Sequence, residues 1–476
     1  MYSFIISIIV LILGYVVYGK ISERIFGIDS KRLTPAIANP DGVDYVPMSW
    51  WRAFLIQFLN IAGLGPIFGA IMGVMFGSAS FLWIVLGTIF AGGVHDYFSG
   101  MMSIRSNGAS LPELVGQELG VSIKQFMRFF SLVLMILVGA VFVSGPAGLL
   151  ANLTPDFINV TWWIVIVFAY YILATLLPID KIIGKIYPVF GFALLFMAVG
   201  IFMAIILNNA PIPEITDGLQ NIHPKKLPIF PIMFVSIACG AISGFHATQS
   251  PLMARCIQNE KYGRRVFYGS MVAEGIVALI WAAAASSFFG SIEGLQQFVA
   301  NLEPTVNKPA VVVDLISKTW LGTFGGILAL LGVIAAPLTS GDTALRSARL
   351  ITADFLHFDQ KPMKNRLIVS VPIFILTFLV LQMNFDVLWR YFAWCNQTLA
   401  VFTLWTITVF LAKNNKFHWI SLVPAMFMTA VTTSYIFIAP EGFHLPELIS
   451  VLLGIGTSLG LFLLFYFKSK KFGKDQ

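Results

Sequence analysis

The sequence predicts an all-α integral membrane protein whose core is two inverted repeats of five helices. Of its 476 residues 58% are hydrophobic and only 11% are charged, whereas a soluble domain carries about 25% charged residues. Apolar runs long enough to cross a bilayer recur along the chain. Two of these runs, at 60–70 and 238–251, are interrupted by glycine and proline. In membrane proteins with inverted repeats, such interrupted spans point to a binding site.

The apolar runs predict about thirteen transmembrane helices, each of a length that can span the hydrocarbon core. Their expected limits are 3–18, 52–76, 81–104, 127–150, 160–178, 185–208, 229–254, 266–290, 320–345, 366–384, 387–412, 418–438 and 447–467. The first run follows no basic segment and precedes no small-residue cleavage site, so we expect a retained helix rather than a signal peptide. Two further segments, 111–123 and 309–318, are expected to be surface helices on the cytoplasmic and outer sides.

The basic residues predict the orientation of these helices. Lys and Arg collect in cytoplasmic loops, and with an external N-terminus only Lys225, Lys226, Lys308 and Lys318 lie outside, while Arg390 lies within a span. We therefore expect the N-terminus outside and the C-terminus in the cytoplasm. The net charge of +7 needs no nucleic-acid partner, because loops facing the cytoplasm account for it. The expected partners are the lipid bilayer and a small-molecule substrate, and nothing predicts an oligomeric state.

The orientation divides the chain into four parts. Residues 1–50 form an N-terminal helix and a cytoplasmic loop, and residues 51–208 form the first repeat, helices 2–6. Residues 229–412 form the second repeat, helices 7–11, in the opposite orientation. Residues 418–476 form two C-terminal helices and a basic tail. The interrupted span is the first helix of each repeat, as expected for a site at the repeat interface.

The interrupted spans supply the candidate substrate-binding residues. In a helix interior Gly costs about 1 kcal/mol and Pro about 3 kcal/mol relative to Ala, so both spans are expected to break. Broken helices present N–H groups to anions and carbonyls to cations, and glycine lets a ligand approach the backbone. Alternatively, the small residues only let helices pack tightly. The candidates are Gly63, Gly65, Gly240, Ser243, Gly244, His246, Gln249 and Asn396.

Ionisable groups within the spans are the candidates for ion coupling. His95, Asp96, His246 and Glu274 are costly in a membrane and suggest a proton relay. Alternatively, each hydrogen-bonds a neighbouring helix.

A second set of polar residues lies near the end of the ninth span. Thr339, Asp342 and Thr343 share one helical face at spacings of three and four residues. They could hold a sodium ion beside the carbonyls of the first break, or Asp342 could carry a proton. Alternatively, Asp342 pairs with Arg346. The ion-coupling candidates are Asn60, Asp96, Thr339, Ser340, Asp342 and Thr343, with H⁺ or Na⁺ as the ion.

The sequence lacks the motifs of common enzyme and metal sites. Cys239, Cys256 and Cys395 show no CxxC spacing and are expected to be reduced structural thiols, with no zinc site. No Walker A motif, HExxH or nucleophile elbow occurs. We therefore expect neither catalytic residues nor a cofactor, and no firm metal site beyond the possible Na⁺ at Thr339, Ser340 and Thr343.

Five motifs, in order, resemble the carbon starvation protein A (CstA) family, in its short form. They are Asp41-Gly42-Val43-Asp44-Tyr45-Val46-Pro47, Ile61-Ala62-Gly63-Leu64-Gly65-Pro66, Gly244-Phe245-His246, Gly341-Asp342-Thr343-Ala344-Leu345-Arg346 and Asn396-Gln397. The resemblance implies a leucine-transporter-like (APC superfamily) core. It also implies an inner-membrane importer of peptides or pyruvate, driven by an ion gradient and used when carbon is scarce. In that fold the cation site joins the first break to the ninth helix, which favours Thr339, Ser340 and Thr343.

The chain departs from the longer family members in two places. They carry a His-His pair where Ile56-Gln57 stand here, and Gln where His95 stands. The proton-coupling group and the substrate are therefore open. A nutrient sensor that binds the same ligands without transport, and a passive channel, are the alternative functions.

Overall fold

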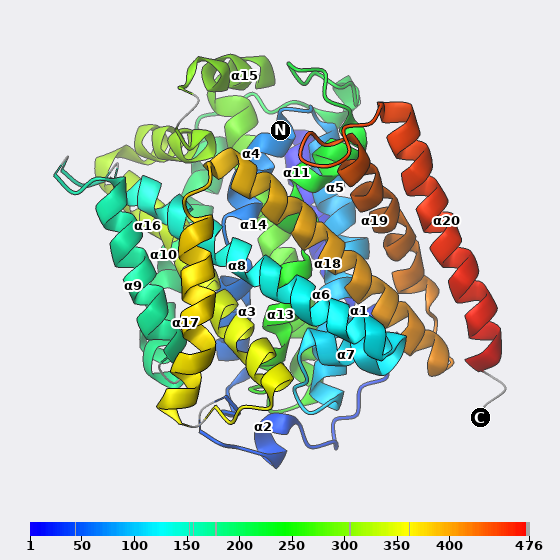
Figure 1. The fold of residues 1–476 in the computed structure, drawn as a ribbon. Helices are drawn as coiled ribbons and strands as arrows, with labels where there is room; N and C mark the ends of the chain where they lie inside the picture. Colours follow the sequence, from blue (N-terminus) through cyan, green and yellow to red (C-terminus); the bar gives the residue numbers. More distant parts are fainter. Residues whose placement is uncertain are drawn as a thin grey trace.

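The computed structural model is an all-helical bundle (Figure 1). It describes the whole chain except residues 43, 152, 156, 177–178, 304–305, 361 and 473–476, and the side chains of 179–188 and 471–472. Val43 of the loop motif and the end of the expected span 160–178 therefore lie outside the described residues. No named β-strand occurs in the part of the chain that is described. The N-terminus and the last described turn of the final helix lie at opposite ends of the bundle (Figure 1).

Ten helical segments within the described residues are long and apolar enough to cross a membrane. They are α1 (Tyr2–Phe26), α5 to α6 (Ala79–Arg105), α8 (Val121–Ala151), α10 (Ile179–Leu207), the segment Glu260–Phe288 that contains α14 (Gly269–Phe288), α16 (Lys308–Leu356), α17 (Met363–Val380), α18 (Phe385–Lys413), α19 (Trp419–Ile438) and α20 (Glu447–Phe472). The pair α3 (Trp50–Ile61) and η1 to α4 (Gly65–Val74), bent by 57°, adds an eleventh.

The remaining two expected spans are less regular. One coincides with α9 (Val160–Leu176), an apolar helix of 17 residues. The other coincides with a series of short pieces: η4 (Ile229–Met233), α11 (Phe234–Ser236), α12 (Ala238–Ala241) and α13 (Gly244–Ala254). The all-α membrane fold is thus confirmed, while the count of thirteen and the division at 51–208 and 229–412 stay predictions.

Short helices lie at both ends of the bundle (Figure 1). The expected helix at 111–123 is α7 (Leu111–Leu119), which stops because Gly120 takes a φ of 101° that favours glycine. The expected helix at 309–318 is the first part of α16, set off by a kink at Gly322 (φ 68°). A further helix, α15 (Ile292–Asn301), is not among the sequence predictions; the Ser291 hydroxyl caps it by accepting from Gly294 N.

Ion pairs and hydrogen bonds tie the surface segments to the bundle. Glu113 of α7 pairs with Lys124 and, at 2.6 Å, with Arg128. Partial burial opposes ionisation of this carboxyl, but the two cations outweigh it and lower the pKa of Glu113. In the 33–49 loop, Met48 N donates to Cys256 O at 2.9 Å, so the loop covers the end of α13.

The long helices enclose the broken ones. α8 and α10 both pack along α16. α19 packs against both α18 and α20, and α19 and α20 stand at one edge of the bundle (Figure 1). The pieces α12 and α13 contact η1, α14, α18 and α6 from the interior. Both helix breaks are therefore surrounded by protein, as unwound backbone at membrane depth requires.

Candidate functional site at two helix breaks

The first break releases a backbone carbonyl that another helix then binds. Beyond the end of α3, Gly63 N donates to Ile61 O at 2.7 Å, so it does not bond Leu59 O as a continuing helix would. Leu59 O instead accepts from the Thr339 hydroxyl at 2.8 Å and from the Ser340 hydroxyl at 3.2 Å, and both hydroxyls share their hydrogen with Ala336 O of α16, at 2.8 and 3.0 Å. The structure thus brings two predicted ion-coupling residues of α16 to the first break.

Asn60 and Thr343 make different contacts. Asn60 is fully buried, and neither polar atom of its side chain has a hydrogen-bond partner among the described residues. The Thr343 hydroxyl donates to Thr339 O and to Ser340 O, both at 3.1 Å, within its own helix. Asn60 is therefore available to a ligand, whereas the contacts of Thr343 are local to α16.

Asp342 lies beside Arg346, as expected from the alternative in which the two residues pair. The carboxylate is 4.0 Å from Arg346 Nη2, and the same nitrogen donates to Ala174 O of α9 at 2.6 Å. Both residues are buried. Both carboxylate oxygens of Asp342 lack a hydrogen bond within the described ranges, so the pair leaves acceptor capacity unused.

The second break is a stretch of extended backbone between α12 and α13. Ile242 (φ −159°, ψ 142°) and Ser243 (φ −145°, ψ 122°) are both extended. The first amides of α13 therefore need an acceptor from elsewhere. Asn396 of α18 supplies it, because its Oδ1 accepts from Phe245 N at 2.7 Å and from the Ser243 hydroxyl at 3.0 Å. Asn396 thus caps α13 from a distant helix.

Gln397, the next residue of α18, serves the other side of the same break. Its Nε2 donates to Ala238 O at 2.8 Å and to Ile242 O at 3.1 Å. Asn396 and Gln397 thus both bond across helices. Together they satisfy two donors and two acceptors at the break.

The two broken helices approach each other closely. A Cβ at Gly65 would overlap the Cβ and Sγ atoms of Cys239. A Cβ at Gly240 would lie 2.7 Å from Ala278 Cβ. Only glycine fits at these two positions. In this conformation the candidate glycines contact protein atoms, so a ligand can reach them only if the helices separate.

Gly63 and Gly244 are also enclosed. A Cβ at Gly63 would lie 2.5 Å from the Phe142 ring, and one at Gly244 would lie 2.6 Å from Leu399 Cβ and overlap the backbone of α18. In the conformation described here, these glycines therefore allow the helices to pack tightly, which is the alternative given in the sequence analysis.

Four ionisable side chains form a buried chain beside the second break. Asp96 accepts His95 Nδ1 at 2.7 Å with one oxygen and His246 Nδ1 at 2.8 Å with the other. His246 Nε2 then lies 3.2 Å from Glu274 Oε2. All four are fully buried. The structure thus brings the predicted Asp96 and His246 together, and Glu274 and His95 extend the chain at its two ends.

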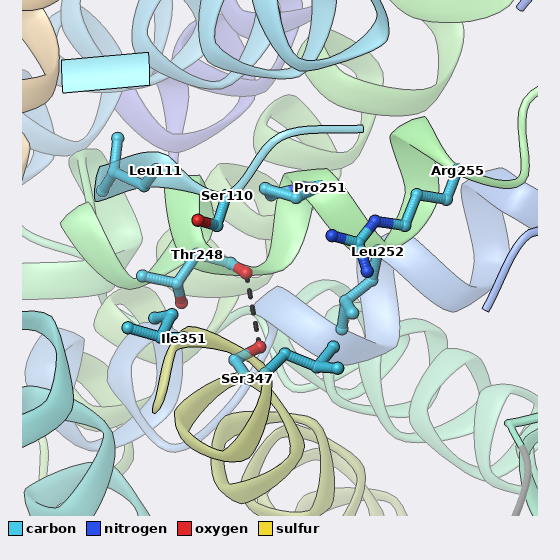
Figure 2. Close-up of a pocket in the computed structure, with 9 residues that line it drawn as sticks. Ser110, Leu111, Thr248, Pro251, Leu252, Arg255, Ser347 and Ile351 are labelled. Carbon is cyan, nitrogen blue, oxygen red and sulfur yellow. Dashed lines mark hydrogen bonds between the residues drawn. The ribbon is translucent and has the colours of Figure 1, made fainter. Parts of the chain in front are cut away.

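Gln249 lies one helical turn beyond His246. Its Nε2 donates to the Thr248 hydroxyl at 3.0 Å and to the Ser347 hydroxyl at 3.4 Å. A cavity of about 20 Å³ adjoins these residues between α7, α13 and α16, where the Ser347 hydroxyl points to Thr248 O (Figure 2). Such a volume holds about one water molecule. Gln249 therefore belongs to the contact between α13 and α16 rather than to the break.

Two residues near the breaks were not predicted as site residues. Cys239 is a buried thiol, as expected, but it faces Gly65 across the two breaks. Gln57 is fully buried, and both polar atoms of its side chain lack a hydrogen-bond partner in the described part of the chain. Spacing gives no signal for Cys239, because its neighbours come from distant segments. For Gln57 the resemblance gave a signal, since the longer family members carry a His-His pair where Ile56-Gln57 stand.

Two opposed broken helices inside a bundle of spanning helices define the fold of leucine-transporter-like membrane transporters. A mutant of the Eremococcus coleocola manganese transporter matches with a TM-score of 0.55 at 13% identity, over 91% of this chain and 99% of that one. MhsT in complex with L-phenylalanine matches with a TM-score of 0.54 at 14% identity, over 86% and 99%. At this identity the likeness concerns the fold.

The chain belongs to the carbon starvation protein CstA family, whose model matches residues 1–155, 152–319 and 308–435. An uncharacterized membrane protein of Haemophilus influenzae is 46% identical over 62% of this chain and 94% of that protein. The peptide transporter CstA of Helicobacter pylori is 26% identical over 88% and 79%. The pyruvate/proton symporter BtsT of Escherichia coli is 28% identical over 59% of this chain and 48% of that protein.

Proposed function

We propose that the protein is a cation-coupled symporter that imports a small carboxylate-bearing nutrient, pyruvate or a short peptide, across the inner membrane when carbon is scarce. The observation that carries this proposal is the pair of opposed breaks, whose freed backbone groups bond side chains of α16 and α18. A ligand can replace these side chains as the partner of the backbone groups without unfolding a helix, as in transporters with discontinuous helices. The substrate classes are those in the names of the family relatives.

The second break suits a carboxylate. The α13 amide end carries a partial positive charge, and its second amide, Phe245 N, is bonded by the Asn396 oxygen in this state. A substrate carboxylate would take over this bond, while Ser243 and His246 flank it. The glycines of both breaks would line the space once the helices separate. Transport would then follow from rocking the first two helices of each repeat against the rest.

The first break suits a cation. Leu59 O and the hydroxyls of Thr339 and Ser340 meet there, and oxygen ligands of this kind coordinate Na⁺ at a helix break. Asn60, whose side chain lacks a partner among the described residues, stands next to this group. A proton is the other candidate, because the Escherichia coli relative is a proton symporter by name. We propose the N-terminus outside and the C-terminus inside, from the distribution of basic residues.

Uptake into proteoliposomes tests the proposal. The full chain is reconstituted, and inward gradients of H⁺ and of Na⁺ are imposed separately with labelled pyruvate or a labelled dipeptide outside. We expect accumulation above the external concentration with one gradient, and loss of accumulation when the matching ionophore is added. Saturable binding without accumulation would favour a sensor, and uptake that only equilibrates and ignores ionophores would favour a channel. No gradient-dependent uptake of any peptide or 2-oxo acid would refute the proposal.

A further inference from the structure

Three potential metal ligands meet at the second break. Cys239 lies on α12, His246 on α13 and Glu274 on α14, and one ligand atom of each lies within 4.8 Å of the other two. All three are buried. His246 Nε2 and Glu274 Oε2 are 3.2 Å apart, whereas two ligands of a tetrahedral ion with bonds of 2.0–2.1 Å stand about 3.3 Å apart. This pair already has the separation that a shared metal ion requires.

The imidazole nitrogen and the carboxylate that face this point lack hydrogen bonds. Among the described residues, His246 Nε2 and both oxygens of Glu274 have no hydrogen-bond partner. Buried polar atoms are almost always paired, and the carboxylate of Glu274 has only its 3.2 Å ion-pair contact with His246 Nε2. One cation between the imidazole, the carboxylate and the nearby thiol would satisfy all of them at once.

The surroundings orient the ligands for coordination. Asp96 binds His246 Nδ1 at 2.8 Å, which directs the opposite nitrogen, Nε2, toward Glu274. A carboxylate on the far nitrogen of a ligating histidine is the usual supporting contact in metal sites. The Asn396 amide donates to Cys239 Sγ at 3.4 Å, a contact that the sulfur could keep when it binds an ion. His95 fixes the other oxygen of Asp96 at 2.7 Å.

We propose that Cys239, His246 and Glu274 form a site for one divalent transition-metal ion of the Zn²⁺ type. A thiolate, an imidazole and a carboxylate suit Zn²⁺ and Co²⁺, whereas Mg²⁺ and Ca²⁺ prefer oxygen ligands only. Binding releases the thiol proton of Cys239 to solvent. Because Cys239 precedes the extended residues of the break and His246 follows them, the ion joins both sides of the break to α14. It would hold the break in the conformation seen here.

Cobalt and zinc titrations of the purified, chelator-treated full chain test the site. We expect one Co²⁺ per chain, with a thiolate-to-Co²⁺ charge-transfer band that Zn²⁺ abolishes and excess Mg²⁺ or Ca²⁺ does not. Cys239→Ser should remove the band and weaken Zn²⁺ binding at least about 10-fold, a loss of 1.4 kcal/mol. The matched control is Cys256→Ser, a buried thiol bonded at 3.8 Å to Asp44 O, which should keep both.

Two further variants keep the test decisive. Glu274→Gln should retain the band but weaken Zn²⁺ binding at least about 10-fold, and Asp96→Asn should weaken it about 10–100-fold through the histidine. Less than stoichiometric Co²⁺, or an unchanged band in Cys239→Ser, would overturn the site. If Cys239→Ser does not elute as a folded protein, unchanged Zn²⁺ affinity in Glu274→Gln overturns it instead. Since the titration needs no substrate and no gradient, its result stands apart from the test of transport.

Discussion

Replacement of Asn396 by alanine should destabilise the second break and impair uptake. The substitution leaves Phe245 N and the Ser243 hydroxyl without their acceptor, both in a buried setting. An unpaired buried N–H costs about 1–3 kcal/mol, and the lost hydroxyl bond adds about 1 kcal/mol. Alanine returns about 0.5 kcal/mol of helix propensity. The expected net loss in the free energy of unfolding is about 1.5–3.5 kcal/mol.

The assay is equilibrium unfolding in mixed micelles, combined with initial uptake rates in proteoliposomes. Asn414→Ala is the matched control, since Asn414 is exposed at the end of the same helix and its side chain donates to Phe410 O within that helix. The control should stay within about 0.5 kcal/mol of the parent protein. If Asn396→Ala were as stable as Asn414→Ala and transported at the parent rate, Asn396 would not hold the break.

Three further substitutions address packing, the cation site and the surface. Gly244→Ala should abolish uptake because its methyl group overlaps the α18 backbone. Gly148→Ala is the control and should leave uptake intact, because no atom lies within 4 Å of the new Cβ. Equal uptake rates in the two variants would contradict the packing account. Thr339→Val removes the hydroxyl at the first break and should raise the half-saturating concentration of the coupling ion about 10-fold if that ion is Na⁺; an unchanged value under a sodium gradient would argue against this site. Glu113→Gln should lower stability by about 1 kcal/mol at neutral pH. Because the folded-state pKa of Glu113 lies below its usual 4.5, this stabilisation is present above pH 4.5 and is lost as the pH falls below it, so parent and variant should converge in acid in thermal unfolding measured against pH.

The sequence predicted the features that depend on local physics. Span length and the helix cost of glycine and proline are local, so the all-α membrane fold and both breaks were predicted correctly. The 10-residue α15 was missed, because it is too short to register as a span and lies between two loops. Hydropathy also could not predict the kink at Gly322, where the outer helix joins the ninth span.

Contacts between distant segments were only partly predictable. Periodicity placed Thr339 and Thr343 on one face, yet Thr343 bonds carbonyls of its own helix, a competition that side-chain hydroxyls commonly offer. The buried polar residues His246 and Asp96 were identified by their cost in a membrane, but their 2.8 Å contact joins residues 150 positions apart. Cys239 gave no signal, because its role depends on the approach of Gly65 and Glu274.

The measurement that tests the central claim most directly is accumulation of labelled pyruvate and dipeptide in proteoliposomes carrying either the parent chain or Gly65→Ala. Gly65 stands where the two breaks touch, and its replacement forces Cys239 away. We predict gradient-driven accumulation by the parent chain and at least a tenfold lower initial rate for Gly65→Ala, about 1.4 kcal/mol. Equal accumulation by both chains would contradict a transport site between the two breaks.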